Sequence, residues 1–146
     1  MEKLAKFFYG WLLNGTEGYS TDFTEDGGWK LCFVLMLLFA IIAAAIYYFV
    51  IATKVKSATT SNYLWTWIFG YIALFFFTPL VFDKWILNEG GESIWEFENN
   101  GWVVFLYIGL VNIVYYTIVF ELASNLFCKS AQTKANNITL LTIFKK

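Results

Sequence analysis

The stretch LCFVLMLLFAIIAAAIYYFVI, residues 31–51, decides the fold of this chain because it contains no charged residue. As an α-helix with a rise of about 1.5 Å per residue, it would be roughly 30 Å long, which matches the hydrocarbon core of a bilayer. Residues 64–82 and 102–120 form two further uncharged apolar runs of similar length. None of the three shows the alternating pattern of a membrane β-strand. The sequence therefore predicts an all-α integral membrane protein with three transmembrane helices.

The composition agrees with this prediction. Of the 146 residues, 59% are hydrophobic, 22% are aromatic and only 14% are charged, and the mean hydropathy is +0.58. These values are far from those of an ordinary soluble domain. Three spans leave few residues for a separate soluble fold, so we expect a single membrane domain over residues 1–146.

Two absences narrow the chemistry. The chain has no histidine, and all ten of its basic residues are lysines. Histidine-based acid–base catalysis and histidine-ligated metals or haem are therefore excluded. Without arginine, the planar fork that usually reads phosphate is missing, and the net charge of −1 gives no basic footprint for nucleic acid. We predict no catalytic, cofactor-binding or metal-binding residue, no enzyme activity and no nucleic-acid partner.

The distribution of lysines predicts the orientation in the membrane. Lys54 and Lys56 lie between the first two runs and four more lysines lie in the tail at 129–146, whereas the connection at 83–101 contains only Lys84. Because lysines concentrate on the cytoplasmic side, the first connection and the C-terminus are expected there. The acidic segments 14–29 and 83–101 are then expected on the outer side.

The N-terminal residues 1–13 show the pattern of an amphipathic helix, with Phe7, Phe8 and Trp11 on its apolar face. This helix is too short to cross a bilayer, so we expect it to lie in the interface. Aromatic residues at the ends of the spans predict two interfacial belts. One belt comprises Trp29, Trp85 and Trp102, and the other comprises Tyr47, Tyr48, Tyr63, Trp65 and Trp67.

The third run carries the polar side chains of most interest. Gly109, Asn112 and Tyr116 recur at i, i+3 and i+7, and this single helix face suits packing against another helix. In an oligomer, Asn112, Thr117 and Glu121 are instead candidates for lining a pore. However, Asn112 and Thr117 lie more than about 120° apart around a straight helix, so they do not face one axis together. Glu121 is expected at the inner interface, and the helix ends either at residue 120 or as far on as residue 128.

Smaller features predict further packing detail. Ala40 and Ala44 form a pair of small residues four apart, which permits close helix association. Pro79 is expected to kink the second helix because it leaves a backbone carbonyl without its helical donor. Cys32 and Cys128 are expected at opposite ends of the spans and therefore unbridged.

The tail contains a second apolar stretch, at residues 138–144, that is too short to span a bilayer. It is expected either to pack on the membrane or to join a partner protein.

Taken together, these features favour a non-enzymatic membrane subunit, embedded in membrane lipids, within a homo-oligomer or a larger membrane complex. Its helix faces, loops and tail would be its contact surfaces. The alternatives are a homo-oligomeric ion channel or pore-forming effector and, less favoured, a membrane enzyme or carrier whose outer acidic residues converge.

Overall fold

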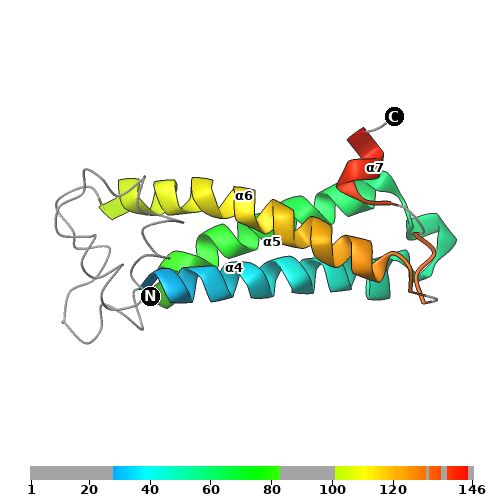
Figure 1. Cartoon of the computed structure of the whole chain (residues 1–146), viewed down its shortest axis with the longest axis horizontal. Helices are drawn as coiled ribbons and strands as arrows, with labels where there is room; N and C mark the ends of the chain where they lie inside the picture. Colours follow the sequence, from blue (N-terminus) through cyan, green and yellow to red (C-terminus); the bar gives the residue numbers. More distant parts are fainter. Residues whose placement is uncertain (1–27, 83–100, 131, 136–137, 145–146) are drawn as a thin grey trace. The chain divides into compact units, whose positions relative to one another are not determined.

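The computed structural model describes residues 28–82, 101–130, 132–135 and 138–144, and within these ranges the chain is helical and contains no strand (Figure 1). The α-helices within these ranges are α4 (Gly28–Ala45), α5 (Thr60–Phe82), α6 (Gly101–Phe127) and the short α7 (Leu140–Phe144). The predicted amphipathic helix with Phe7, Phe8 and Trp11, and the acidic segments with Trp85, lie outside the described residues.

Three of the described segments are long and apolar enough to cross a membrane: Trp29–Thr53, Thr60–Val81 and Ile108–Phe127. The prediction of three membrane-length helices is therefore confirmed by length and composition. The observed helices are longer than the apolar runs. α5 begins at Thr60, before the run that starts at residue 64, and α6 continues well past Phe120. α5 also continues through Pro79 to Phe82.

The first span changes its helical form near its end. α4 is followed directly by a π-helical turn, Ile46–Val50, and then by a 3₁₀ turn, Ile51–Thr53. The backbone N–H of Ile51 donates to the carbonyls of both Ile46 and Tyr47, which marks the widened turn. Consecutive Tyr47 and Tyr48 are both fully buried here. Such π-helical turns often occur at functional sites.

The chain divides into two compact units, which we describe separately. The first comprises Met1–Leu35 and Phe75–Ile113, and the second comprises Met36–Leu74 and Val114–Lys146. In the first unit, the described buried side chains include Cys32, Thr78, Ile108 and Asn112. The second unit holds all of the polar contacts discussed below.

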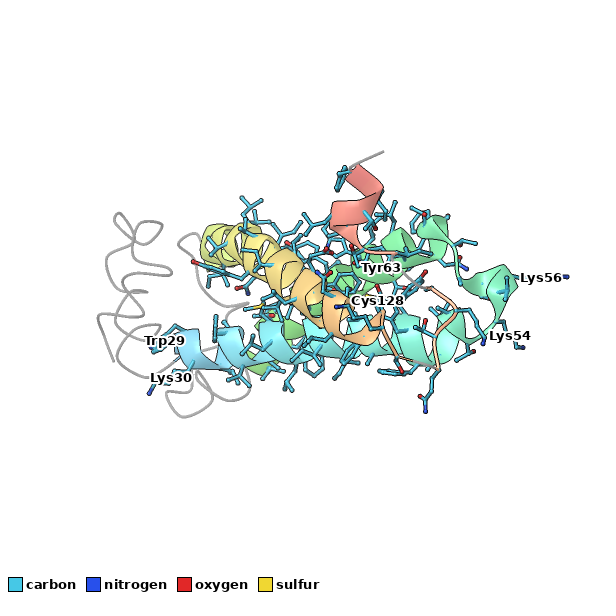
Figure 2. The ribbon with its side chains drawn as sticks, turned by 45° about the vertical axis from the view of Figure 1, so that its right-hand side comes forward. Trp29, Lys30, Lys54, Lys56, Tyr63 and Cys128 are labelled. Atoms are coloured by element: carbon cyan, nitrogen blue, oxygen red, sulfur yellow. The ribbon has the colours of Figure 1, made fainter. Side chains whose placement is uncertain are left out.

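Within the second unit, α5 runs antiparallel to both α4 and α6. Tyr63 contacts Tyr47 of the first span and Glu121 of α6, whereas Gly70, further along α5, lies against Ala43 and Tyr116. The partners' numbers fall as those of α5 rise. The connection after the first span and the segment after α6 therefore lie at the same end of this unit. Its exposed lysines are Lys54, Lys56, Lys129 and Lys134, of which Figure 2 labels the first two.

The three helices come close together around Gly70. A Cβ atom at this position would collide with the hydroxyl of Tyr116 and would lie 2.7 Å from the Cβ of Ala43. Both Ala43 and Tyr116 are buried, so neither has free space to move into. Gly70 is thus required by close packing in the second unit.

We expect Gly70→Ala to destabilise the protein in detergent by about 1–3 kcal/mol, because the added methyl group overpacks this contact. The measurement is the midpoint of unfolding followed by circular dichroism. Adding Tyr116→Phe to Gly70→Ala removes the colliding hydroxyl, so the double variant should lose less than the sum of the two single losses. An unchanged midpoint for Gly70→Ala would contradict the close packing.

Candidate functional site: a buried tyrosine cluster and Glu121

Three buried aromatic rings lie together in the second unit, near the end that carries Lys54 and Lys56. The tyrosine cluster consists of Tyr47, Tyr48 and Tyr63, and all three side chains are fully buried. The ring of Tyr47 meets that of Tyr48 at 4.9 Å and that of Tyr63 at 5.0 Å between centroids, both edge to face. This geometry is favourable for aromatic pairs. The π-helical turn contributes two of the three rings.

Each phenolic hydroxyl of the cluster contacts a polar group of the same chain. Tyr47 donates to the carbonyl of Thr59 at 3.0 Å, and Tyr48 donates to the carbonyl of Ile138. The sequence predicted these three tyrosines as an interfacial belt facing headgroups. The structure shows that their side chains are buried inside the protein, whereas Trp65 is 54% exposed, and the level of these rings in a membrane stays a prediction.

The third hydroxyl joins the cluster to α6. The Tyr63 hydroxyl lies 3.2 Å from Oε2 of Glu121 and 3.0 Å from Oγ of the fully buried Ser124. Both groups are within hydrogen-bond distance of the one phenolic proton. α5 and α6 are thereby linked by polar contacts at the level of the tyrosine cluster.

Glu121 receives four donors from the described residues. Besides Tyr63, the backbone N–H of Leu140 donates to Oε2 at 2.8 Å, the N–H of Leu141 donates to Oε1 at 3.2 Å, and the side-chain amide of Asn125 donates to Oε1 at 3.3 Å. An ionised carboxylate offers about four acceptor positions. The half-buried Glu121 therefore has its hydrogen-bonding capacity filled by groups of its own chain.

The donors from Leu140 and Leu141 belong to the first turn of α7. Thr139, immediately before the helix, donates its N–H to Oγ1 of Thr142 at 2.9 Å, and the N–H of Thr142 lies 3.4 Å from Oγ1 of Thr139. This reciprocal pair resembles a capping box with threonine in the fourth position. A helix of five residues is not stable alone. Glu121 and Thr139 together satisfy the free amides at its start.

The segment leading to α7 is held at a further position. The N–H of Lys134 donates to the carbonyl of Ala52, at the end of the first span, at 2.7 Å. With the bonds from Tyr48 and Glu121, the tail is thus attached to the first span and to α6. The sequence predicted that residues 138–144 pack on the membrane or join a partner. The structure shows that the start of this stretch is bonded to the chain's own helices, and its contact with the membrane or a partner stays a prediction.

The predicted residues of α6 are divided between the two units. Tyr116 is fully buried in the second unit, where its hydroxyl donates to the carbonyl of Trp67 at 3.2 Å and its ring stacks on Phe120. Gly109 and Asn112 are buried in the first unit. Thr117, like Glu121, is half-buried in the second unit. The burial of the predicted face agrees with helix packing, and a role in a pore stays a prediction.

The structure also places the predicted alanine pair, the two cysteines and Trp29. Ala40 and Ala44 are fully buried, and Cys32 and Cys128 are both free. Trp29 is buried at the start of α4, with the ammonium of Lys30 6.0 Å from its ring centroid, and the side chain of Trp102 lies outside the described residues. In the part of the chain that the structure describes, no group of three histidines, cysteines or acids gathers to hold a metal.

No protein-family model matches the chain, and neither a curated protein nor a solved structure is significantly similar to it.

Sequence reasoning missed most of this site. One signal was available, since Thr139 and Thr142 have the spacing of a capping box before an apolar stretch. No local sequence pattern predicts that Glu121 accepts hydrogen bonds from the backbone amides of Leu140 and Leu141, which lie 19 and 20 residues further along the chain. No local pattern distinguishes a tyrosine at the membrane interface from one buried inside the protein.

We expect Glu121→Gln to release α7 from α6. The glutamine amide removes acceptor capacity and the negative charge at the helix start, and hydrogen bonds to a charged group contribute about 1.5–3 kcal/mol. Backbone amides of residues 138–144 should then exchange with deuterium roughly ten to a hundred times faster. The measurement is hydrogen–deuterium exchange of the C-terminal peptide by mass spectrometry.

Leu122→Ala is the matched control, because Leu122 is adjacent to Glu121 but 61% exposed. Its C-terminal peptide should exchange at the wild-type rate. Equal exchange rates in wild type and Glu121→Gln would show that the carboxylate does not hold α7.

Proposed function

We propose that this protein is a small non-enzymatic membrane subunit that assembles with copies of itself or with other membrane proteins. Its contacts would be the apolar faces of its helices and its anchored C-terminal segment. The observation that carries the proposal is the use of Glu121. It is the only acidic residue among the described ones, and its acceptor positions are filled in holding the chain's own tail.

The outward face of α6 supports assembly or lipid contact rather than conduction. In the second unit its exposed residues at every fourth position are Val114, Ile118, Leu122 and Leu126. This spacing forms an apolar ridge of the kind that packs into a groove of another helix. A pore lined by α6 would need a polar stripe in place of this ridge. Glu121 would also have to exchange its internal donors for water or ions.

The tail supports a role in contact with a partner. Leu140 is buried, whereas Leu141 is 58% exposed and Phe144 is 81% exposed. The bonds from Glu121 fix the start of α7, so these apolar side chains are presented from a held backbone. Ordering a contact segment in advance lowers the entropic cost of binding. We propose that α7 is a docking element on the cytoplasmic side, the orientation favoured by the lysines at this end.

The test is native mass spectrometry of the full chain after gentle detergent extraction from its own membranes. We expect a defined assembly with other membrane polypeptides or a small closed homo-oligomer. The variant Leu141→Ser/Phe144→Ser should weaken the assembly at least tenfold, because exposed apolar anchors carry much of the energy of an interface.

Val55→Ser is the control, since Val55 is 75% exposed in the first connection and lies outside the proposed contact. A strictly monomeric protein would refute the proposal. A homo-oligomeric ring that conducts ions in planar bilayers, with conductance lost in Asn112 or Glu121 variants, would replace it with the channel alternative.

A further inference from the structure

An apolar groove runs between α4 and α5 in the second unit, with a volume of about 580 Å³. Its lining residues come from the two facing helices and from the turn after the first span. The lining includes Phe39, Ala43 and Ile51 of the first span and Asn62, Trp65 and Gly70 of α5. Both helices belong to candidate membrane spans, so the medium that meets this groove in a bilayer is lipid.

The size of the groove suits a single acyl chain. Along the first span the lining extends from Phe39 to Ile51, which is roughly 18 Å at the helical rise of about 1.5 Å per residue. One leaflet of the hydrocarbon core is about 15 Å thick. A partner helix of this length and about 10 Å diameter would occupy roughly 1,400 Å³, far more than the groove provides.

The groove has a polar end. Asn62 and Thr66 are its polar lining residues, and both lie in the first two turns of α5. The amide of Asn62 donates to the carbonyl of Ser57 at 3.0 Å, which places this end beside the connection between the first two spans. Trp65 and Phe69 stack at 5.4 Å and continue the apolar wall from this end along α5.

The polar end is also positively charged. Lys54 and Lys56 lie in the adjacent connection, are exposed, and extend away from the helices in Figure 2. Glu121 is the sole acidic residue in the described part of the chain, and it already accepts hydrogen bonds from side chains of α5 and α6 and from backbone amides of α7. An apolar slot whose polar end lies beside a connection with two exposed lysines is complementary to a lipid with a negative headgroup.

We infer that the groove between α4 and α5 binds one acyl chain of an anionic phospholipid, with the headgroup beside Lys54 and Lys56. The inference rests on membrane embedding alone and does not depend on the proposed assembly. The acyl chain fills the apolar slot between Phe39 and Trp65. The lysines select the headgroup by charge, so phosphatidylglycerol is favoured over zwitterionic phosphatidylcholine.

The test uses the full chain reconstituted in nanodiscs that contain equal amounts of phosphatidylglycerol and phosphatidylcholine. Lipids that stay bound after release from the disc are counted and identified by native mass spectrometry. We expect one retained lipid per chain, enriched in phosphatidylglycerol. Lys54→Gln/Lys56→Gln should reduce this enrichment on the order of tenfold, because each lysine near an anionic surface contributes to the attraction.

A second variant tests the slot itself. Ala73 is an exposed lining residue, so Ala73→Phe should fill the groove without disturbing the core, and retention of either lipid should fall. Its control is Ile72→Phe, an exposed neighbour outside the lining. The control for the charge change is Lys30→Gln/Lys129→Gln, which removes two lysines outside the first connection.

Retention and headgroup preference that are unchanged in both test variants would overturn the inference. So would a dimer that excludes lipid and is disrupted by Ala73→Phe, because the groove would then be a helix interface. Circular dichroism of each variant verifies folding. The native mass spectra report the oligomeric state, so failure of the lipid site is distinguished from failure of the proposed assembly.

Discussion

A carboxylate within a helix that is apolar enough to span a membrane must have donors, and the architecture of the second unit follows from how Glu121 obtains them. An ionised group in a medium of low dielectric constant is costly unless it is paired and hydrogen-bonded. No described cation lies in a salt bridge with Glu121; its donors are a phenol, an amide and two backbone N–H groups. The free amides at the start of a short helix serve this purpose well, because they need an acceptor as much as the carboxylate needs donors. The carboxylate of α6 thereby gains donors, and the free amides at the start of α7 gain an acceptor.

The tyrosine cluster extends the same logic to the first span. Changing from α-helix to π-helix at Ile46 allows two consecutive tyrosines to be buried, one bonded to the connection and the other to the tail. Buried polar networks are stable when every member has a partner, and removing one member leaves the others exposed to the full cost of desolvation. Tyr63 and Ser124 connect this network to Glu121. The π-helical turn of the first span, the position of the C-terminal segment and the hydrogen bonding of Glu121 therefore depend on one another.

Much of the fold, but little of this site, was predictable from the sequence. The absence of charge over residues 31–51 is a property of composition, so it predicts a membrane-length helix without knowledge of any contact. The roles of Tyr47 and Glu121 depend on partners distant in the chain. Tyrosines near a span end fit an interfacial belt and a buried network equally well, and only the return of the tail to Tyr48 distinguishes the two. Similarly, residues 138–144 are apolar enough to pack on a membrane surface, but the free backbone amides of Leu140 and Leu141 donate to Glu121.

Gly70 connects the packing of this unit with the proposed lipid site. The same residue lies against Ala43 and Tyr116 and contributes to the lining of the groove. Its missing side chain lets α4, α5 and α6 approach closely, and the residue also forms part of the wall of the groove between α4 and α5. In water such an apolar groove would be unfavourable, but in a bilayer an acyl chain makes dispersion contacts along its walls. A lipid in this slot would therefore complete the packing of α4 and α5 along the groove, and the lysines of the connection would determine which lipid does so.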